Sequence, residues 1–532
     1  MLQLLGLLSQ LLIDTSFSWI RMFIALFFSI LISLAVGIYA ARSERSGRII
    51  VPILDILQTL PILAFFPFVI YIVVATLPGY IGINAAVIFL IITSMIWNIS
   101  FGVYESIRTL PVQLTEVARL YHLTGWQKLT KVLIPASMPR VVEQSVLSWS
   151  IGLFYLVTSE IFSTGSAQYA VKYGIGVELT KLAFSGNLTY YAIGLAVFVL
   201  FVIATRFLFF MPFSRRVNRF NDYRKRPGEP GRGTAMMQRF GGAIARLDPR
   251  AAMAQRLHAL RQRPEQIGTA SARRAPSQTA QVRPTLHTKR KYWIVAALSI
   301  AALAALLYFP EAGAYELRVL ASLAESFVRV WVAFGAVLAV AVPLSIYIVF
   351  MSKHGNSYLT LFQIVASIPA TILLPVIALA LANVAFHGEL VAFVVYFLSG
   401  IWYVVFSVVA STRTLPKYVF EVKSLFRVKG RAALSKIYLK AITPGLITGG
   451  ITAIAAEWNA SIVAEYFTTS AIGNGALVSS VHIGIGKLLD LSLSSGNLTL
   501  MFIGLVNLTV MIIVLNTFLW KRLYRNISKI YG

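Results

Sequence analysis

Long apolar stretches separated by short polar segments dominate the hydropathy pattern of this chain. A helix needs about 20 apolar residues to cross a bilayer. Five stretches of that kind precede a long polar segment, at 17–40, 50–76, 81–103, 142–163 and 188–212. Six follow it, at 292–309, 321–350, 357–382, 388–410, 446–467 and 498–519. The pattern therefore predicts an all-α integral membrane protein with about 11 transmembrane helices.

The first residues, Met1–Ile13, are apolar but too short to span a bilayer. They contain no basic run and no small-residue cleavage site, so they do not resemble a signal peptide. We expect them to form a separate interfacial helix.

Lysine and arginine in the short loops predict the orientation, because basic loops stay on the cytoplasmic side. Basic residues follow the first span and fill the segments 104–141 and 411–445. Eleven alternating spans place all of these segments inside if the N-terminus is outside. The acidic loop with Glu311 and Glu316 then falls outside. We expect a multi-pass plasma membrane protein with a cytoplasmic C-terminus.

The two parts of the chain repeat one pattern. Residues 105–139 and 410–444 align at a constant offset of 305, and SGNLT recurs at 185–189 and 495–499. The identities include Arg108/Arg413, Pro111/Pro416, Glu116/Glu421, Gly125/Gly430 and Pro139/Pro444. An even number of crossings separates matching spans, so the two copies have the same orientation. We expect two homologous five-helix cores related as a parallel repeat, with one extra span at 292–309.

The repeated segment 104–139 is too polar to span a membrane. Leu114, Val117, Ala118 and Tyr121 recur at spacings of three and four, which predicts a helix with one apolar face. Gly125 is expected to break this helix, and a second short one is expected to end at Pro135. Such a helix fits a groove on a partner protein. The alternative is an interfacial helix that ties two spans together.

Composition excludes a soluble protein and most enzyme chemistry. Hydrophobic residues make up 58% of the 532 residues and charged residues 13%, and there is no cysteine. The six histidines are scattered, so we expect no metal site and no catalytic residues. Gly486-Lys487 is followed by Leu488, so the pair does not complete a phosphate-binding loop. The chain therefore has no standard site for ATP, and its energy source must be another polypeptide or an ion gradient. We expect no cofactor.

The long polar segment 214–291 holds more than half of the net charge of +27, with 19 basic and four acidic residues. Its Gly, Pro, Ser and Gln content predicts a largely disordered linker. A basic segment between spans is typical of a cytoplasmic stretch lying on anionic membrane lipid. Binding to nucleic acid is the alternative, and we do not favour it.

Ionisable residues within the predicted spans are candidates for function. Glu160 and Glu465 occupy matching spans, and Arg21 and Arg329 match one another at an offset of 308. Each glutamate either lines a solute pathway or gate, or pairs with its arginine as a structural contact. Four further pathway candidates lie on the same two spans: Trp149, Ser159, Trp458 and Asn459.

The segment 104–139 resembles the EAA loop of binding-protein-dependent ABC importer permeases. Glu116, Val117 and Ala118 match the start of that motif, and Pro135 with Pro139 matches its end. The sequence YHLTGWQKLTKVLIPASMP is similar to that of the nitrate/sulfonate/bicarbonate branch of this family. Within that branch it resembles the anion transport systems that have a duplicated permease component. The resemblance covers the chain outside the linker and Met1–Ile13.

The resemblance implies a fold and a set of partners. It implies a type I importer-like fold, with permease domains at 1–213 and 292–532 and EAA loops at 104–139 and 410–444. It also implies alternating access driven by two separate ATPase subunits, with a solute-binding protein outside. The residues expected to couple to the ATPases are Glu116, Val117, Ala118, Gly125, Pro135, Pro139, Glu421, Gly430 and Pro444.

Two departures and two alternatives accompany this resemblance. His122 and Arg427 stand where the motif has its glycine, and Lys440 replaces a proline in the second copy, so the two docking sites need not be equivalent. The first alternative is a fused ferric iron or thiamine permease, which also has two EAA loops. The sequence HLTGWQ argues against this alternative. An ion-coupled secondary transporter with parallel repeats would need no ATPase.

Overall fold

The computed structural model describes residues 2–59, 69, 72–73, 76–77, 79–110, 114, 116, 118, 120–164, 171–218, 312–352, 355–412, 430–468 and 478–520. By contacts the chain divides into one unit of Met1–Val217 with Tyr292–Gly532 and a second of Asn218–Lys291. Apart from Asn218, the second unit, which holds nearly all of the predicted linker, lies outside the described residues, as does the predicted span at 292–309.

The described residues form helices in both halves of the chain. In the first half these are α1 (Leu2–Arg42), α2 (Glu44–Thr59), α4 (Tyr80–Arg108), α6 (Gly125–Lys128), α7 (Ile134–Thr164), α8 (Ile175–Phe184), α9 (Leu188–Ala204) and α10 (Met211–Asn218). In the second half they are α14 (Ala312–Ile346), α15 (Gly355–Val365), α16 (Ala370–Leu381), α17 (His387–Thr412), α19 (Gly430–Ala433), α20 (Leu439–Ala464), α21 (Ile485–Ser494) and α22 (Leu498–Leu515). A hairpin of β1 (Tyr466–Thr468) and β2 (Val478–Ser480) pairs antiparallel, with Tyr466 opposite Ser480.

Eight helical segments among the described residues are long and apolar enough to cross a membrane. They correspond to the predicted spans at 17–40, 81–103, 142–163, 188–212, 321–350, 388–410, 446–467 and 498–519. The all-α membrane class is thereby confirmed. The predicted span at 50–76 is represented by the 16-residue helix α2, and most of its remainder lies outside the described residues.

The predicted continuous span at 357–382 is wrong. The chain forms two helices there, α15 and α16, and α16 has only 12 residues. Pro369 is the N-cap of α16 and has extended backbone angles, φ −61° and ψ 134°. A proline disfavours helical geometry at the residue before it, so the helix stops short of Pro369 and restarts after it.

The prediction of a separate interfacial helix at Met1–Ile13 is also wrong, because α1 runs unbroken for 41 residues from Leu2 to Arg42. The polar residues after Ile13 stay within the helix by bonding locally. The Gln10 amide donates to Asp14 at 2.8 Å, and the Thr15 hydroxyl donates to the Leu11 carbonyl at 2.6 Å. Polar residues whose side chains bond within the helix do not end it.

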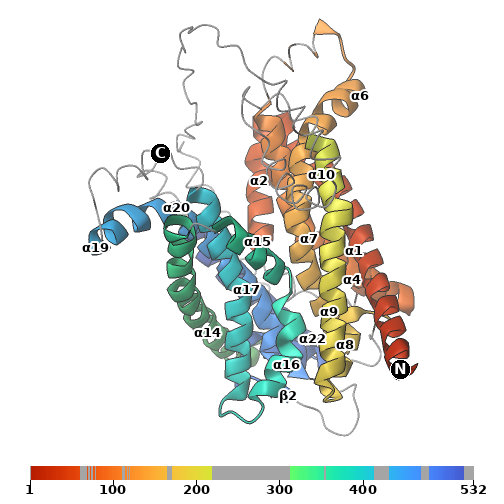
Figure 1. Cartoon of the computed structure of the whole chain (residues 1–532), viewed down its shortest axis with the longest axis vertical. Helices are drawn as coiled ribbons and strands as arrows, with labels where there is room; N and C mark the ends of the chain where they lie inside the picture. Colours follow the sequence, from red (N-terminus) through yellow and green to blue (C-terminus); the bar gives the residue numbers. More distant parts are fainter. Residues whose placement is uncertain are drawn as a thin grey trace, which may run out of the picture. The chain divides into compact units, whose positions relative to one another are not determined.

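The repeat predicted from sequence is present as matching helices. Helices α1, α4 and α7 pack in succession in the first half, and α14, α17 and α20 do so in the second (Figure 1). A π-helical turn precedes α7 at Leu129–Leu133, and another precedes α20 at Leu434–Tyr438, at the offset of 305. The two halves therefore share even this local irregularity.

Small residues allow close packing of the central helices, but the two halves place them on opposite helices. In the first half Gly102 of α4 faces Gln144 of α7: a Cβ on Gly102 would lie 2.6 Å from the Gln144 Cγ. In the second half the glycine is Gly449 of α20, and a Cβ there would lie 2.9 Å from the Cβ of Ser407 on α17. At the offset of 305, Ser407 matches Gly102 and Gly449 matches Gln144. The glycine of this contact is therefore on the other helix in the second half.

Candidate functional site

Glu160 and Glu465 each form an ion pair with the matching arginine, which is one of the two alternatives that the sequence left open. Arg21 Nη1 lies 2.8 Å from Glu160 Oε1, with side chains 4% and 0% exposed. Arg329 Nη1 lies 3.5 Å from Glu465 Oε1, with side chains 12% and 0% exposed. Each pair joins the start of its half, α1 or α14, to the end of the long helix α7 or α20. Buried carboxylates are found with such partners because an unpaired charge is costly there.

The same two carboxylates cap short helices. The Gly176 N–H donates to Glu160 Oε2 at 2.8 Å, and the Gly486 N–H donates to Glu465 Oε2 at 2.7 Å. The first N–H groups of a helix have no partner inside it, and a negative charge is favourable at that end. Each glutamate thus fixes the N-terminus of α8 or α21 against its own half.

Serines on α1 and α14 complete these clusters, and the sequence analysis did not identify them. The Ile175 N–H donates to Ser18 Oγ at 3.0 Å, and the Ile485 N–H donates to Ser326 Oγ at 2.9 Å. The glycines that admit the carboxylates were also missed: a Cβ on Gly174 or Gly484 would lie 2.7 Å from the Cδ of its glutamate. The repeated Gly-Ile-Gly at 174–176 and 484–486 was the pattern that pointed to them.

The arginines of the two clusters have different further partners. Arg21 Nε donates to the Asn84 amide oxygen at 2.7 Å, whereas Arg329 pairs with Glu389, with Nη2 at 3.0 Å from Oε1. Asn84 and Glu389 match at the offset of 305. The Tyr396 hydroxyl adds a bond to Glu465 Oε1 at 3.0 Å. Corresponding positions of the two halves therefore have different electrostatics.

Glu457 is a buried carboxyl that the sequence analysis passed over. It lies on α20, is 0% exposed, and both its oxygens lack a hydrogen-bond partner among the described residues. Its carboxyl fills the space beside Gly400 of α17, where a Cβ would collide with it. The matching first-half positions are Gly152 and Met95. The exchange of small and large residues is repeated here, with an acid in place of methionine.

Replacing Glu457 with methionine is expected to raise the free energy of unfolding by about 1–3 kcal/mol, because the variant removes buried polar atoms that have no partner. Glu457→Gln is the control of equal size, and its amide remains unpartnered, so little gain is expected. Reversible unfolding in mixed micelles measures both. A clear loss of stability in Glu457→Met would mean that the carboxyl makes a favourable contact in the native protein.

The remaining pathway candidates lie in different surroundings. Trp149 packs within the first half, with its ring 5.0 Å from Phe23 and 5.4 Å from Phe210. Ser159 donates to the Leu156 carbonyl of its own helix at 2.8 Å, and Trp458 is 2% exposed. Asn459 accepts a 2.8 Å hydrogen bond from the Tyr155 hydroxyl of the other half. Of these four, Asn459 is the residue that hydrogen-bonds to a described residue of the other half.

The segment 104–139 of the first half presents large apolar side chains on its surface. Leu120, Tyr121 and Trp126 are 75%, 77% and 72% exposed. Glu116 is exposed and Ala118 is 4% exposed, while Val117 lies outside the described residues. Exposed apolar residues gathered in one short segment are typical of an interaction site.

The turn in this segment lies before Gly125 and not at it. His122 has φ 47°, the left-handed region that favours glycine, and it stands at the position where the EAA motif has glycine. Thr124 then caps α6: it accepts from the Gln127 N–H at 3.3 Å, and the Gln127 side chain accepts from the Thr124 N–H at 3.0 Å. Gly125 is the first residue of that helix.

The expectation that a helix ends at Pro135 is wrong. Helix α6, the π-helical turn and α7 follow one another without a break, and both Pro135 and Pro139 lie in α7. A π-helical turn shifts the hydrogen-bond pattern just before Pro135, a residue without an N–H. In the second half Gly430 starts α19 with φ 59°, and Pro444 lies inside α20. Glu421 lies outside the described residues.

Comparison with known proteins agrees with this architecture. The family of binding-protein-dependent transport system inner membrane components matches twice, at residues 33–218 and 332–529. The glycine betaine/proline betaine transport system permease protein ProW of Escherichia coli (strain K12) is 29% identical over 153 residues, 29% of this chain and 41% of the relative. No solved structure matches.

Relatives named for anion transport are similar at comparable levels. The putative aliphatic sulfonates transport permease protein SsuC of Bacillus subtilis (strain 168) is 27% identical over 165 residues, 31% of this chain and 57% of the relative. The nitrate import permease protein NrtB of Leptolyngbya laminosa is 26% identical over 132 residues, 25% of this chain and 45% of the relative. The chain thus spans about half the length of these relatives in each alignment.

Two copies of one helical membrane unit, each with a buried Arg–Glu cluster and a polar segment between spans, define a multi-pass membrane protein with duplicated halves. The chain belongs to the family of binding-protein-dependent transport system inner membrane components, the permeases of ABC importers, and carries two copies of the family domain.

Proposed function

We propose that this chain is the membrane-spanning subunit of an ABC importer that moves a small anion of the nitrate, sulfonate or bicarbonate type across the plasma membrane. Residues 1–213 and 292–532 are its two permease domains, and 214–291 is a cytoplasmic linker. The N-terminus lies outside and the C-terminus inside. Two separate ATPase subunits hydrolyse ATP, and a solute-binding protein delivers the solute outside. The two halves alternate between access from the two sides.

The exposed apolar segment around Glu116 carries this proposal. Tyr121 and Trp126 are more than two thirds exposed, on a segment that ends in a defined turn at His122. A partner with an apolar groove would bury these side chains, which is the physical requirement for a docking site. The same sequence pattern recurs at 410–444, which supports two docking sites on one chain.

The proposal of an anion as solute is supported by the amino-acid sequence of the 121–139 segment and by the relatives named for sulfonate and nitrate transport. The betaine relative is named for a zwitterionic solute, so family membership alone leaves the solute open. We propose an anion as the solute because the sequence of the 121–139 segment and the names of these two relatives both favour it.

Copurification from native membrane tests the ATPase docking. A tagged wild-type chain is expected to bring down a stoichiometric ATPase, and Glu116→Arg with Glu421→Arg is expected to lose it, because a reversed charge on each loop opposes docking. Glu44→Arg is the matched control, because Glu44 is also a surface acid: it lies on α2 and its side chain is 67% exposed. Each single variant reports whether the two docking sites are equivalent.

The opposite outcome favours the ion-coupled alternative. If no ATPase accompanies wild type or variant, and uptake follows an ion gradient imposed across the membrane, the docking proposal is wrong. A secondary transporter with parallel repeats would then be the better account.

A further inference from the structure

Three buried hydrogen bonds between described residues join the first half of the chain to the second. The Tyr155 hydroxyl donates to Asn459 Oδ1 at 2.8 Å, and the hydroxyls of Thr158 and Thr371 lie 3.2 Å apart. The Tyr191 hydroxyl donates to the Ile372 carbonyl at 2.8 Å. We call these six residues the seam.

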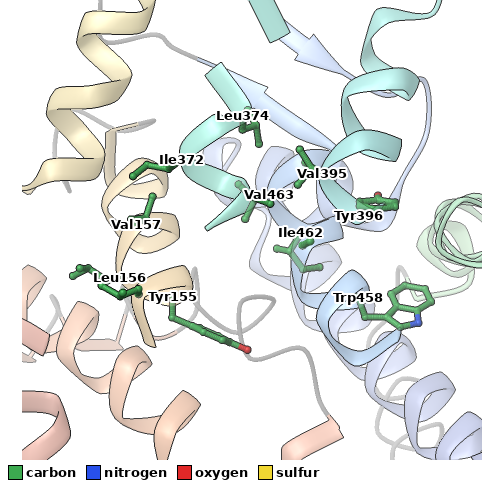
Figure 2. Close-up of a cluster of buried hydrophobic side chains, with 14 of the residues drawn as sticks. Tyr155, Leu156, Val157, Ile372, Leu374, Val395, Tyr396, Trp458, Ile462 and Val463 are labelled. Atoms are coloured by element: carbon green, nitrogen blue, oxygen red, sulfur yellow. The ribbon is translucent and has the colours of Figure 1, made fainter. Parts of the chain in front are cut away.

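Apolar side chains surround the seam and leave little access to it. Tyr155 and Asn459 are 5% and 7% exposed, and Thr158 and Thr371 are 0% exposed. Figure 2 shows the apolar residues around them, from α7, α16 and α20: Leu156, Val157, Ile372, Leu374, Ile462 and Val463. In this state the polar groups of the two halves satisfy one another and the space between them is closed.

The seam side chains that bond across the halves are all neutral. Among the buried ionisable groups, Arg21 with Glu160 and Arg329 with Glu465 are engaged in the capping clusters. Glu457 is also buried on α20, but its carboxyl packs beside Gly400 of α17 and makes none of the three bonds of the seam. The seam instead offers hydroxyl donors from both halves, on Tyr155, Thr158 and Thr371. Hydroxyl donors suit an oxygen-rich anion, and a carboxylate among them would repel it.

We propose that Tyr155, Thr158, Thr371 and Asn459 form a gate that closes by pairing across the halves and opens into a transient binding site for a small oxyanion. This inference rests on the proposed function, because it needs the two halves to separate. On separation each hydroxyl loses its partner, and a buried donor without a partner is costly. Oxygen atoms of the solute can accept from hydroxyls of both halves at the same time. The solute is therefore held at the point where the two halves separate.

The absence of cysteine from the sequence allows a direct test of the gate. Tyr155→Cys with Asn459→Cys is treated with a short bifunctional thiol reagent, and a protease site inserted within 227–285 separates the halves on a denaturing gel. Cross-linked halves are expected without nucleotide, and at least a fivefold loss of cross-linking is expected in the ATPase-bound complex trapped with ATP and vanadate. Each single-cysteine chain serves as the control for links between molecules.

A labelling experiment tests the binding site. In the trapped complex, Tyr155→Cys is expected to react with a water-soluble thiol reagent, and nitrate or ethanesulfonate is expected to slow that reaction at least threefold. The added pair Thr158→Val and Thr371→Val should abolish the protection while keeping side-chain shape. Thr180→Val is the matched control, because Thr180 is also buried but bonds the Gly176 carbonyl within its own half at 2.7 Å.

The outcomes separate this inference from the proposed function. Cross-linking that is unchanged by nucleotide, in a preparation that retains its ATPase, overturns the gate and leaves the importer assignment standing. Protection by neither anion, or protection that survives removal of both threonine hydroxyls, overturns the oxyanion site. Loss of the ATPase from the wild-type preparation contradicts the proposed function itself.

Discussion

Replacing Arg21 with methionine is expected to lower the free energy of unfolding by about 3–5 kcal/mol, because it leaves the buried Glu160 carboxylate without its ion pair. Glu160 is 0% exposed and also holds the N-terminus of α8. Loss of the guanidinium therefore loosens the contact between α1, α7 and α8 together. Reversible unfolding in mixed micelles measures the change.

Matched variants show whether this loss comes from the buried pair. Arg48→Met removes an ion pair with Glu44 whose side chains are both 67% exposed, and it should leave stability unchanged. Adding Glu160→Gln to Arg21→Met should restore part of the loss, because the amide oxygen can still accept from the Gly176 N–H. Wild-type stability in Arg21→Met would show that Glu160 does not depend on the ion pair.

The equivalent change in the second half provides an internal comparison. Arg329→Met leaves three carboxylates behind, because Arg329 pairs with Glu465, Glu389 and the exposed Glu325. Glu389 is 34% exposed, so water can screen part of its charge, while Glu465 is fully buried. A loss at least as large as that of Arg21→Met is expected.

Gly449→Gln is the second substitution with a large expected effect, a loss of about 3 kcal/mol through overpacking of α17 against α20. A Cβ at this position would lie 2.8 Å from the Val404 Cα, so the two helices must move apart to admit the side chain. Small residues at such a crossing are what lets two membrane helices approach closely. Unfolding in mixed micelles is again the measurement.

Ser407→Gly is expected to recover part of this loss. The double variant recreates the first-half arrangement, in which Gly102 lies opposite Gln144. Thr448→Gln places the same side chain on the exposed face of α20 and should cost less. If Ser407→Gly gives no recovery, the exchange of small and large residues between the halves does not explain how the two crossings pack.

The sequence by itself determined the membrane class, eight of the spans and the duplication. Lipid cannot hydrogen-bond the backbone, so long apolar helices are imposed locally and can be recognised along the chain. The repeat also offered the pairing of Glu160 with Arg21, and of Glu465 with Arg329, as one of two alternatives, and the structure shows both ion pairs. The helix break before Pro369 has a local cause, but it was not predicted because the apolar stretch 357–382 is long enough to form one span.

Only the tertiary structure decided which polar groups meet. Ser18 and Glu160 are 142 positions apart, and Tyr155 and Asn459 are 304 apart, yet each pair is hydrogen-bonded. Their meeting depends on how α1, α7 and α20 pack, and periodicity within one helix carries no information on that. The unpartnered Glu457 arises in the same way, because its surroundings come from another helix. The capping clusters and the seam are thus products of packing between distant segments.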